Sequence, residues 1–188
     1  MNYTPEIDAA LSSREPIPRQ KGLVWMESAT DLPTLAKLYR LTGEGHYRIQ
    51  PELGKVAECS AVRNYLLGCV RQNVTDDEEI QSRWEAAATL HLWLRQLFEM
   101  GDASDEIDKT GQAITELFLT GGQEIQLAIE QGFLEHALES ASLRPYFEHW
   151  SKDERLRDTF QAATEWANDH PDFSWNLHQE FRKRIDKM

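Results

Sequence analysis

The chain has 188 residues, 40% of them hydrophobic and 28% charged, which is the balance of an ordinary globular protein rather than a disordered one. Its formal net charge of −12 disfavours binding to nucleic acid or to an anionic membrane surface, because both carry repelling phosphates. The sequence has neither a secretory signal nor an apolar run approaching the roughly 18 residues of a membrane span, so we expect a cytoplasmic protein.

Polar residues and prolines characterise the N-terminal segment. Pro5, Pro16 and Pro18 are spaced so that they would interrupt regular structure. We therefore expect a polar arm over residues 1–21. A chain of this length usually forms one domain, so residues 22–188 are expected to make a single helical domain.

Caps and prolines indicate the first two helices of this domain. Asp31 or Thr30 caps a helix that carries a proline in its first turn and reaches about Thr42. After a loop that contains two glycines, Pro51 opens a second helix that ends near Asn73.

The clearest helical pattern lies in the middle of the chain. Thr75 and Glu78 have the spacing of a capping box, and Gly101 marks the end of the helix that we expect after them. Between these points apolar residues repeat at alternating spacings of four and three, which predicts one continuous buried stripe. The stripe consists of Ile80, Trp84, Ala87, His91, Leu94 and Phe98.

The remaining helices are separated by glycines and short polar turns. Ser104 begins the next helix, and the pair Gly121 and Gly122 ends it. The helix from Gln123 to about Ser140 is apolar on two sides, which is typical of a central helix. Shorter helices then lead to a basic C-terminus. These signals predict an all-α fold, a single irregular bundle of about seven or eight helices.

Two histidines are the individual residues of most chemical interest. His91 and His136 each lie in the middle of an apolar helical stripe, and Trp84 lies on the same stripe as His91. One interpretation is an interhelical pocket for a small molecule or for acid–base chemistry. The other is that each histidine is buried, neutral and hydrogen-bonded to a neighbour.

Motifs for catalysis or metal binding are not found in the sequence. No histidine has a glutamate three residues before it, and there is no zinc-binding, phosphate-binding or nucleophile motif. We therefore expect no catalytic residue, no metal site and no cofactor, and predict a protein that is not an enzyme.

Acidic residues are concentrated in the middle of the chain. Residues 75–140 contain fifteen Asp or Glu and three Lys or Arg, whereas the rest of the chain is balanced. One interpretation is solvated surface, in part because acids near helix starts favour the helix dipole. The other is a face that binds a basic protein. The candidate residues of this face are Glu85, Glu99, Glu116, Glu124, Glu130, Glu135 and Glu139.

Aromatic residues gather in the last quarter of the chain. Core packing is one interpretation of this cluster. The other is that Trp166 or Trp175 is exposed and anchors a protein partner. A homodimer that buries a C-terminal aromatic surface is a separate possibility, for a regulatory or scaffold subunit.

One segment resembles a known class of protein. Residues 122–139, centred on Gly132-Phe-Leu-Glu135, and the following Tyr146-Phe-Glu-His-Trp150 are similar to small helical bacterial proteins of uncharacterised families, some thought to be immunity proteins beside secreted toxins. This resemblance implies a protein-binding function, and the acidic surplus would suit a basic toxin such as a nuclease. The alternatives are a small-molecule-binding or enzymatic domain near the two histidines, and a helical regulatory or scaffold subunit.

Overall fold

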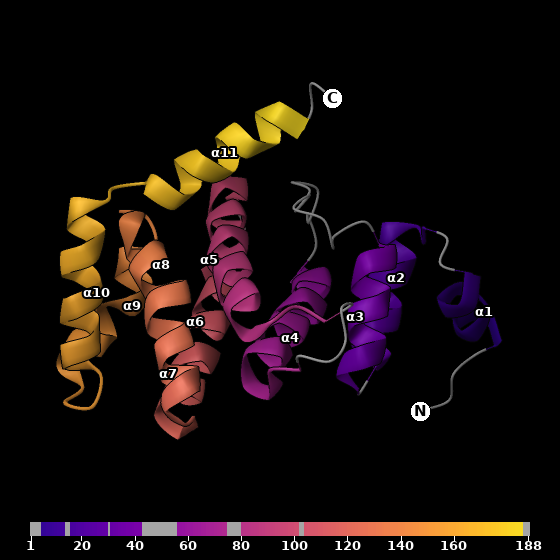
Figure 1. The fold of residues 1–188 in the computed structure, drawn as a ribbon, viewed down its shortest axis with the longest axis horizontal. Helices are drawn as coiled ribbons and strands as arrows, with labels where there is room; N and C mark the ends of the chain where they lie inside the picture. The colour runs from indigo at the N-terminus through magenta and orange to yellow at the C-terminus, as the bar shows by residue number, and fades with distance from the viewer. Residues whose placement is uncertain are drawn as a thin grey trace. The chain divides into compact units, whose positions relative to one another are not determined.

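The computed structural model describes residues 5–13, 16–29, 31–42, 56–74, 80–101 and 104–185. Within these ranges eleven α-helices, one π-helical turn and one 3-10 turn form ten continuous helical segments, with no strand (Figure 1). The all-α prediction is confirmed, and the predicted count of seven or eight helices is too low. No helix in the described part of the chain is long and apolar enough to cross a membrane.

Two compact units divide the chain where the sequence predicts one domain, and the boundary falls inside α5 (Arg83–Met100). Residues 1–86 contain α1 (Pro5–Ser13), α2 (Arg19–Ser28), α3 (Leu32–Leu41), α4 (Val56–Gln72) and the first turn of α5. Residues 87–188 contain the rest of α5, α6 (Ser104–Thr120), α7 (Gln123–Ile129), the π turn (Glu130–Leu134), α8 (Glu135–Glu139), α9 (Arg144–Phe147), the 3-10 turn (Glu148–Lys152), α10 (Arg157–Asp169) and α11 (Phe173–Ile185).

Helix α1 and the first three residues of α2 lie in the segment 1–21, for which the sequence predicts a polar arm. Pro5 is the first residue of α1, where a proline costs the helix no hydrogen bond. Pro16 and Pro18 lie between the two helices. The prolines therefore bound helices instead of preventing them, which corrects the arm prediction.

Pairwise packing of α2, α3 and α4 forms the core of the first unit. Asp31 caps α3, because its carboxylate accepts the Thr34 N–H at 2.9 Å, and this confirms the prediction for that residue. The rings of Tyr39 and Tyr65 stack between α3 and α4, with their centroids 4.4 Å apart.

Helix α5 begins with a capping box that the sequence analysis did not identify. The Ser82 N–H donates to the Glu85 carboxylate at 2.9 Å, and the Glu85 N–H donates to the Ser82 hydroxyl at 3.3 Å. The expected box at Thr75–Glu78 lies outside the described residues. Along α5 the centre of the predicted stripe is buried, whereas Trp84 near the first end is 47% exposed.

The run from α7 through the π turn to α8 is the central helix of the second unit, as its two apolar sides predict. It packs against α6, α9, α10 and α11 (Figure 1). The turn between α6 and α7 is the predicted Gly121–Gly122 pair. In the π turn the Glu135 N–H bonds to the Glu130 carbonyl five residues earlier, a widened helical geometry that often marks functional sites.

Candidate functional site

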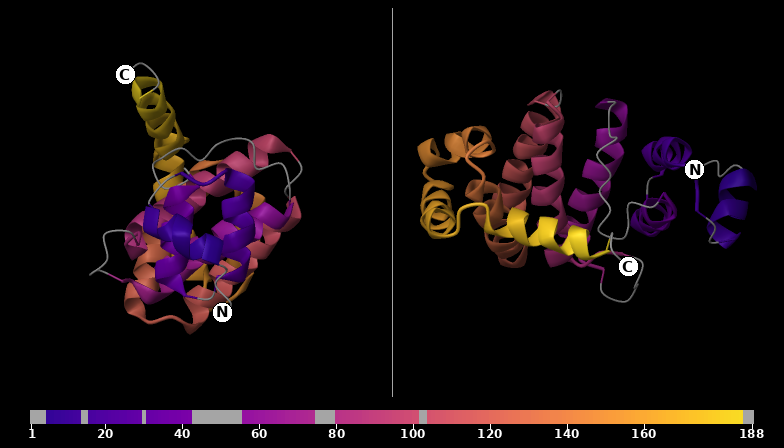
Figure 2. Two further views of the ribbon diagram at one scale, coloured as in Figure 1. Left: turned by 90° about the vertical axis from the view of Figure 1, so that its right-hand side faces the viewer. Right: turned by 90° about the horizontal axis from the view of Figure 1, so that it is seen from above.

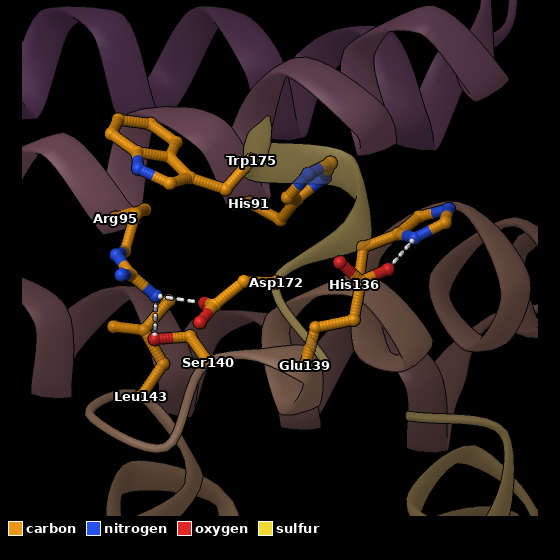
Figure 3. A pocket seen from close by; sticks show the side chains of 8 residues that line it. All are labelled: His91, Arg95, His136, Glu139, Ser140, Leu143, Asp172 and Trp175. Carbon is orange, nitrogen blue, oxygen red and sulfur yellow. Dashed lines mark hydrogen bonds and ion pairs between the residues drawn. The ribbon is translucent and has the colours of Figure 1, made fainter. Parts of the chain in front are cut away.

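A small cavity in the second unit is surrounded by polar side chains from α5, from the end of α8 and from the start of α11. Its lining residues are His91, Arg95, His136, Glu139, Ser140, Leu143, Asp172 and Trp175 (Figure 3). The cavity measures about 10 Å³. A single water molecule needs about 10–15 Å³ on this measure, so the space suits one water and no larger ligand.

Glu139 is buried at the end of α8 and caps the start of α11. Its carboxylate accepts the Ser174 N–H at 2.7 Å and the Ser174 hydroxyl at 2.8 Å. Ser174 is the second residue of α11, and such first-turn N–H groups have no partner inside their own helix. The negative charge also suits the positive end of the α11 dipole. The expectation that Glu139 belongs to an acidic surface is therefore corrected.

His136 completes a triangle with these two residues. Its Nδ1 lies 2.7 Å from the Glu139 carboxylate and 2.7 Å from the Ser174 hydroxyl. Because a carboxylate only accepts hydrogen bonds, Nδ1 must carry the hydrogen. A serine-hydrolase relay needs the serine and the carboxylate on opposite ring nitrogens, whereas here both meet Nδ1. This geometry orients the imidazole and does not activate the serine.

His91 faces His136 across the helices, with ring centroids 5.0 Å apart. Its side chain is buried beside the backbone of Gly132. Burial lowers the pKa of His91 well below its usual range, and the nearby His136 and His178 rings lower it further. The ring is therefore neutral at pH 7. The burial of His91 and the direction of its pKa agree with the interpretation as a buried neutral histidine.

A second anchor for α11 comes from Arg95 on α5. Its Nη1 donates to the Asp172 carboxylate at 3.0 Å and to the Ser140 hydroxyl, as Figure 3 shows. The guanidinium also lies 5.4 Å from the centre of the Trp175 ring, within the range of a cation–π contact. Asp172 has a φ of 53°, a left-handed conformation that Asp tolerates better than most residues. Arg95 thus fixes the sharp turn from which α11 starts.

The tryptophans expected as anchors or pocket residues have other surroundings. Trp166 is partly buried between two imidazoles, edge-on to His136 at 4.9 Å and stacked on His170 at 4.3 Å. Trp175, also partly buried, contacts Arg95. Both therefore make contacts within the unit while remaining partly exposed. Trp84 does not line the cavity, which corrects its assignment to a pocket.

The other acidic candidates do reach solvent. Glu99, Glu116 and Glu124 are exposed, and Glu130 and Glu135 are partly exposed. Glu99 forms an ion pair with Arg95, and Glu85 belongs to the capping box of α5. Asp105 and Asp108 of α6 are also exposed. The sequence explains them as acids near a helix start, and they are not among the candidate residues of the acidic face.

Crowding perturbs two of these carboxyl groups. Partial burial raises the pKa of Glu130 and of Glu135 above the ordinary value. At Glu135 the nearby His136 opposes this rise and the negative charge of Glu130 adds to it. Both groups would be better stabilised as anions if a cation approached them.

Local spacing could have identified part of this site. Glu139 follows His136 by three residues and Arg95 follows His91 by four, so each pair shares one helix face. The metal-binding motif considered above has a glutamate three residues before a histidine, whereas Glu139 comes three residues after His136. Asp172 and Ser174 carry no comparable signal, because their partners are distant in sequence.

Two further observations concern metal binding and similarity to known proteins. The described ranges contain no group of three or more His, Cys, Asp or Glu side chains placed to hold a metal ion. Comparison of the chain with protein families, with curated proteins and with solved structures finds no match.

Replacing Glu139 should destabilise the second unit. Glu139→Ala leaves the Ser174 and His136 donors buried without their acceptor, so we expect the free energy of unfolding to fall by about 2–4 kcal/mol. Glu116→Ala removes an exposed glutamate and should change it by less than about 0.5 kcal/mol. Urea denaturation of both variants measures the difference, and equal losses would contradict the capping role.

Acid should destabilise the protein through His91. Since the folded pKa is lowered, the unfolded chain binds the proton more readily, and stability is lost as the pH falls below about 6.5, by up to about 1.4 kcal/mol per pH unit. Urea denaturation between neutral and mildly acidic pH measures this slope. His91→Leu should remove this part of the slope, and an unchanged slope would show that His91 is protonated in the folded state.

Proposed function

We propose that the chain is a non-enzymatic protein-interaction domain whose acidic surface on α6, the π turn and the flanking helices binds a basic partner protein. The acidic surface consists of Asp105, Asp108, Glu116, Glu124, Glu130 and Glu135. The observation that carries the proposal is the small number of basic residues in this part of the chain. Residues 104–139 are all described and contain Lys109 as their single Lys or Arg.

The placement of these acids on α6 supports a binding face. Asp105, Asp108 and Glu116 are exposed and are separated by three and eight residues, so at about 100° per residue they lie on one side of the helix. Helix α7 packs beside α6 and adds Glu124. A surplus of exposed acids speeds encounter with a positively charged protein and favours it over other partners.

The buried polar residues support a non-enzymatic role. The cavity between His91 and His136 suits one water molecule. The hydrogen bonds of His136, Glu139 and Ser174 are directed at one another, where they hold the start of α11. A substrate would have to displace these contacts before it could reach either imidazole. The alternative of a small-molecule site near the histidines therefore gains no support from the geometry.

An immunity-like neutraliser is the specific form of this function that we propose. The resemblance of residues 122–150 to immunity-like bacterial proteins covers α7, the π turn and α8, which carry three acids of the proposed surface. A toxin that acts on nucleic acid needs a basic surface, and an acidic protein that covers that surface would block it.

Neutralising the acidic surface should abolish partner binding. The triple variant Asp105→Asn, Asp108→Asn, Glu116→Gln removes three charges and leaves the helix length unchanged. Tagged wild-type protein, incubated with a lysate of the source organism and analysed by quantitative mass spectrometry, should retain a basic protein. We expect that protein to be lost with the triple variant, and to elute between about 0.1 M and about 1 M salt, where the screening length falls from about 10 Å to about 3 Å.

A matched variant distinguishes the effect of the acidic surface from the effect of a lower net charge. Asp8→Asn, Glu27→Gln, Glu154→Gln removes three exposed acids elsewhere and should retain the same protein. If both triple variants lost the partner equally, or if retention did not depend on salt, the proposed surface would be wrong.

A further inference from the structure

Helix α11 carries an exposed apolar row that the proposed function does not use. Phe173, Leu177 and Phe181 are 52%, 59% and 46% exposed and follow one another at intervals of four residues. On the same helix Trp175 is partly buried against Arg95 of α5, and His178 is buried. Three large apolar side chains on one side of a helix form a contact surface rather than scattered exposure.

Contacts with α5 anchor the start of this helix. Helix α11 follows α10 and crosses the end of α5, where Arg95 contacts Asp172 and Trp175 (Figures 1 and 2). A groove of about 370 Å³ opens along its first half. Phe173 and Leu177 are among its lining residues, and Asp169 and Glu180 supply its carboxylates.

The pattern of the row is self-complementary. Its order Phe–Leu–Phe is the same in both directions, with Leu177 at the centre. If two copies pair antiparallel about a twofold axis at Leu177, Phe173 of each copy meets Phe181 of the other. The leucines meet on the axis. A second copy of the chain is therefore a complementary partner for this row.

Charges at the two ends of the helix favour the same arrangement. The acidic Asp169 lies just before α11, and the exposed basic Lys183 and Arg184 lie at its far end. Antiparallel pairing brings the basic end of one copy to the acidic rim of the groove on the other. A uniformly basic or uniformly acidic partner would be repelled at one of the two ends.

We infer that α11 is a dimerisation helix, which pairs antiparallel with α11 of a second copy through Phe173, Leu177 and Phe181. This inference is independent of the proposed acidic surface, which lies on other helices. A contact between two single helices belongs to the class of weak interfaces, below about 1,200 Å² of total buried area. The dimer should therefore dissociate on dilution through the micromolar range.

Analytical ultracentrifugation of the full chain tests the inference. We expect the mass of the wild-type protein to rise from one copy to two as its concentration increases. Leu177→Asp places two like charges on the axis and should weaken association by more than about ten-fold. Val24→Asp is the matched control, because Val24 on α2 is also 59% exposed, and it should associate like wild type. Circular dichroism confirms that both variants are folded.

A charge exchange tests the antiparallel orientation. Arg184→Glu should weaken the dimer, and the double variant Arg184→Glu, Asp169→Lys should recover association, because opposite charges then face each other again. A double variant no stronger than the single one would overturn the antiparallel arrangement.

A wild-type protein that stays monomeric at every concentration would overturn the dimer itself, as would equal effects of Leu177→Asp and Val24→Asp. If Leu177→Asp instead removed a different protein from the lysate capture while the chain stayed monomeric, the row would belong to that protein. The dimer would be excluded, and the acidic surface would be judged separately by its own variants.

Discussion

The Glu139 carboxylate joins the last residue of α8 to the first turn of α11. A buried carboxylate is costly unless donors surround it, and here the Ser174 N–H, the Ser174 hydroxyl and the His136 Nδ1–H supply them. Each donor depends on Glu139 in turn, so the position of α11, the tautomer of His136 and the conformation of the preceding turn are set together. Arg95 strengthens the same junction through Asp172.

This junction separates the residues that hold the fold from the residues that face outward. The two histidines, which were candidates for chemistry, line a cavity that suits one water molecule. The pKa of His91 is lowered, and His136 is hydrogen-bonded to Glu139. The groups that remain for a partner are on the surface. They are the carboxylates of α6, α7 and α8, and the apolar row of α11 that the junction holds in place. The proposed interaction functions therefore depend on a polar core that takes no part in them.

Periodicity and caps predicted much of the fold, and burial in three dimensions decided the rest. The all-helical class, the Asp31 cap and the central helix follow from local pattern, since each depends on residues a few positions apart. Glu139 could not be told from the exposed glutamates around it, because its partner Ser174 is 35 residues away. The same limit applies to the contact of Trp166 with His136, which is 30 residues away. The sequence analysis did not identify the apolar row of α11, whose exposure distinguishes it from core residues.

The most direct test of this account is the amide hydrogen exchange of Ser174, measured by NMR in the wild-type protein and in Glu139→Gln. The account predicts a slowly exchanging Ser174 amide in the wild type. Glutamine keeps the size of the side chain but loses the charge and one acceptor, so exchange in the first turn of α11 should become faster while α6 is unchanged. A Ser174 amide that exchanges rapidly in the wild type, or that is indifferent to the substitution, would show that Glu139 does not hold α11.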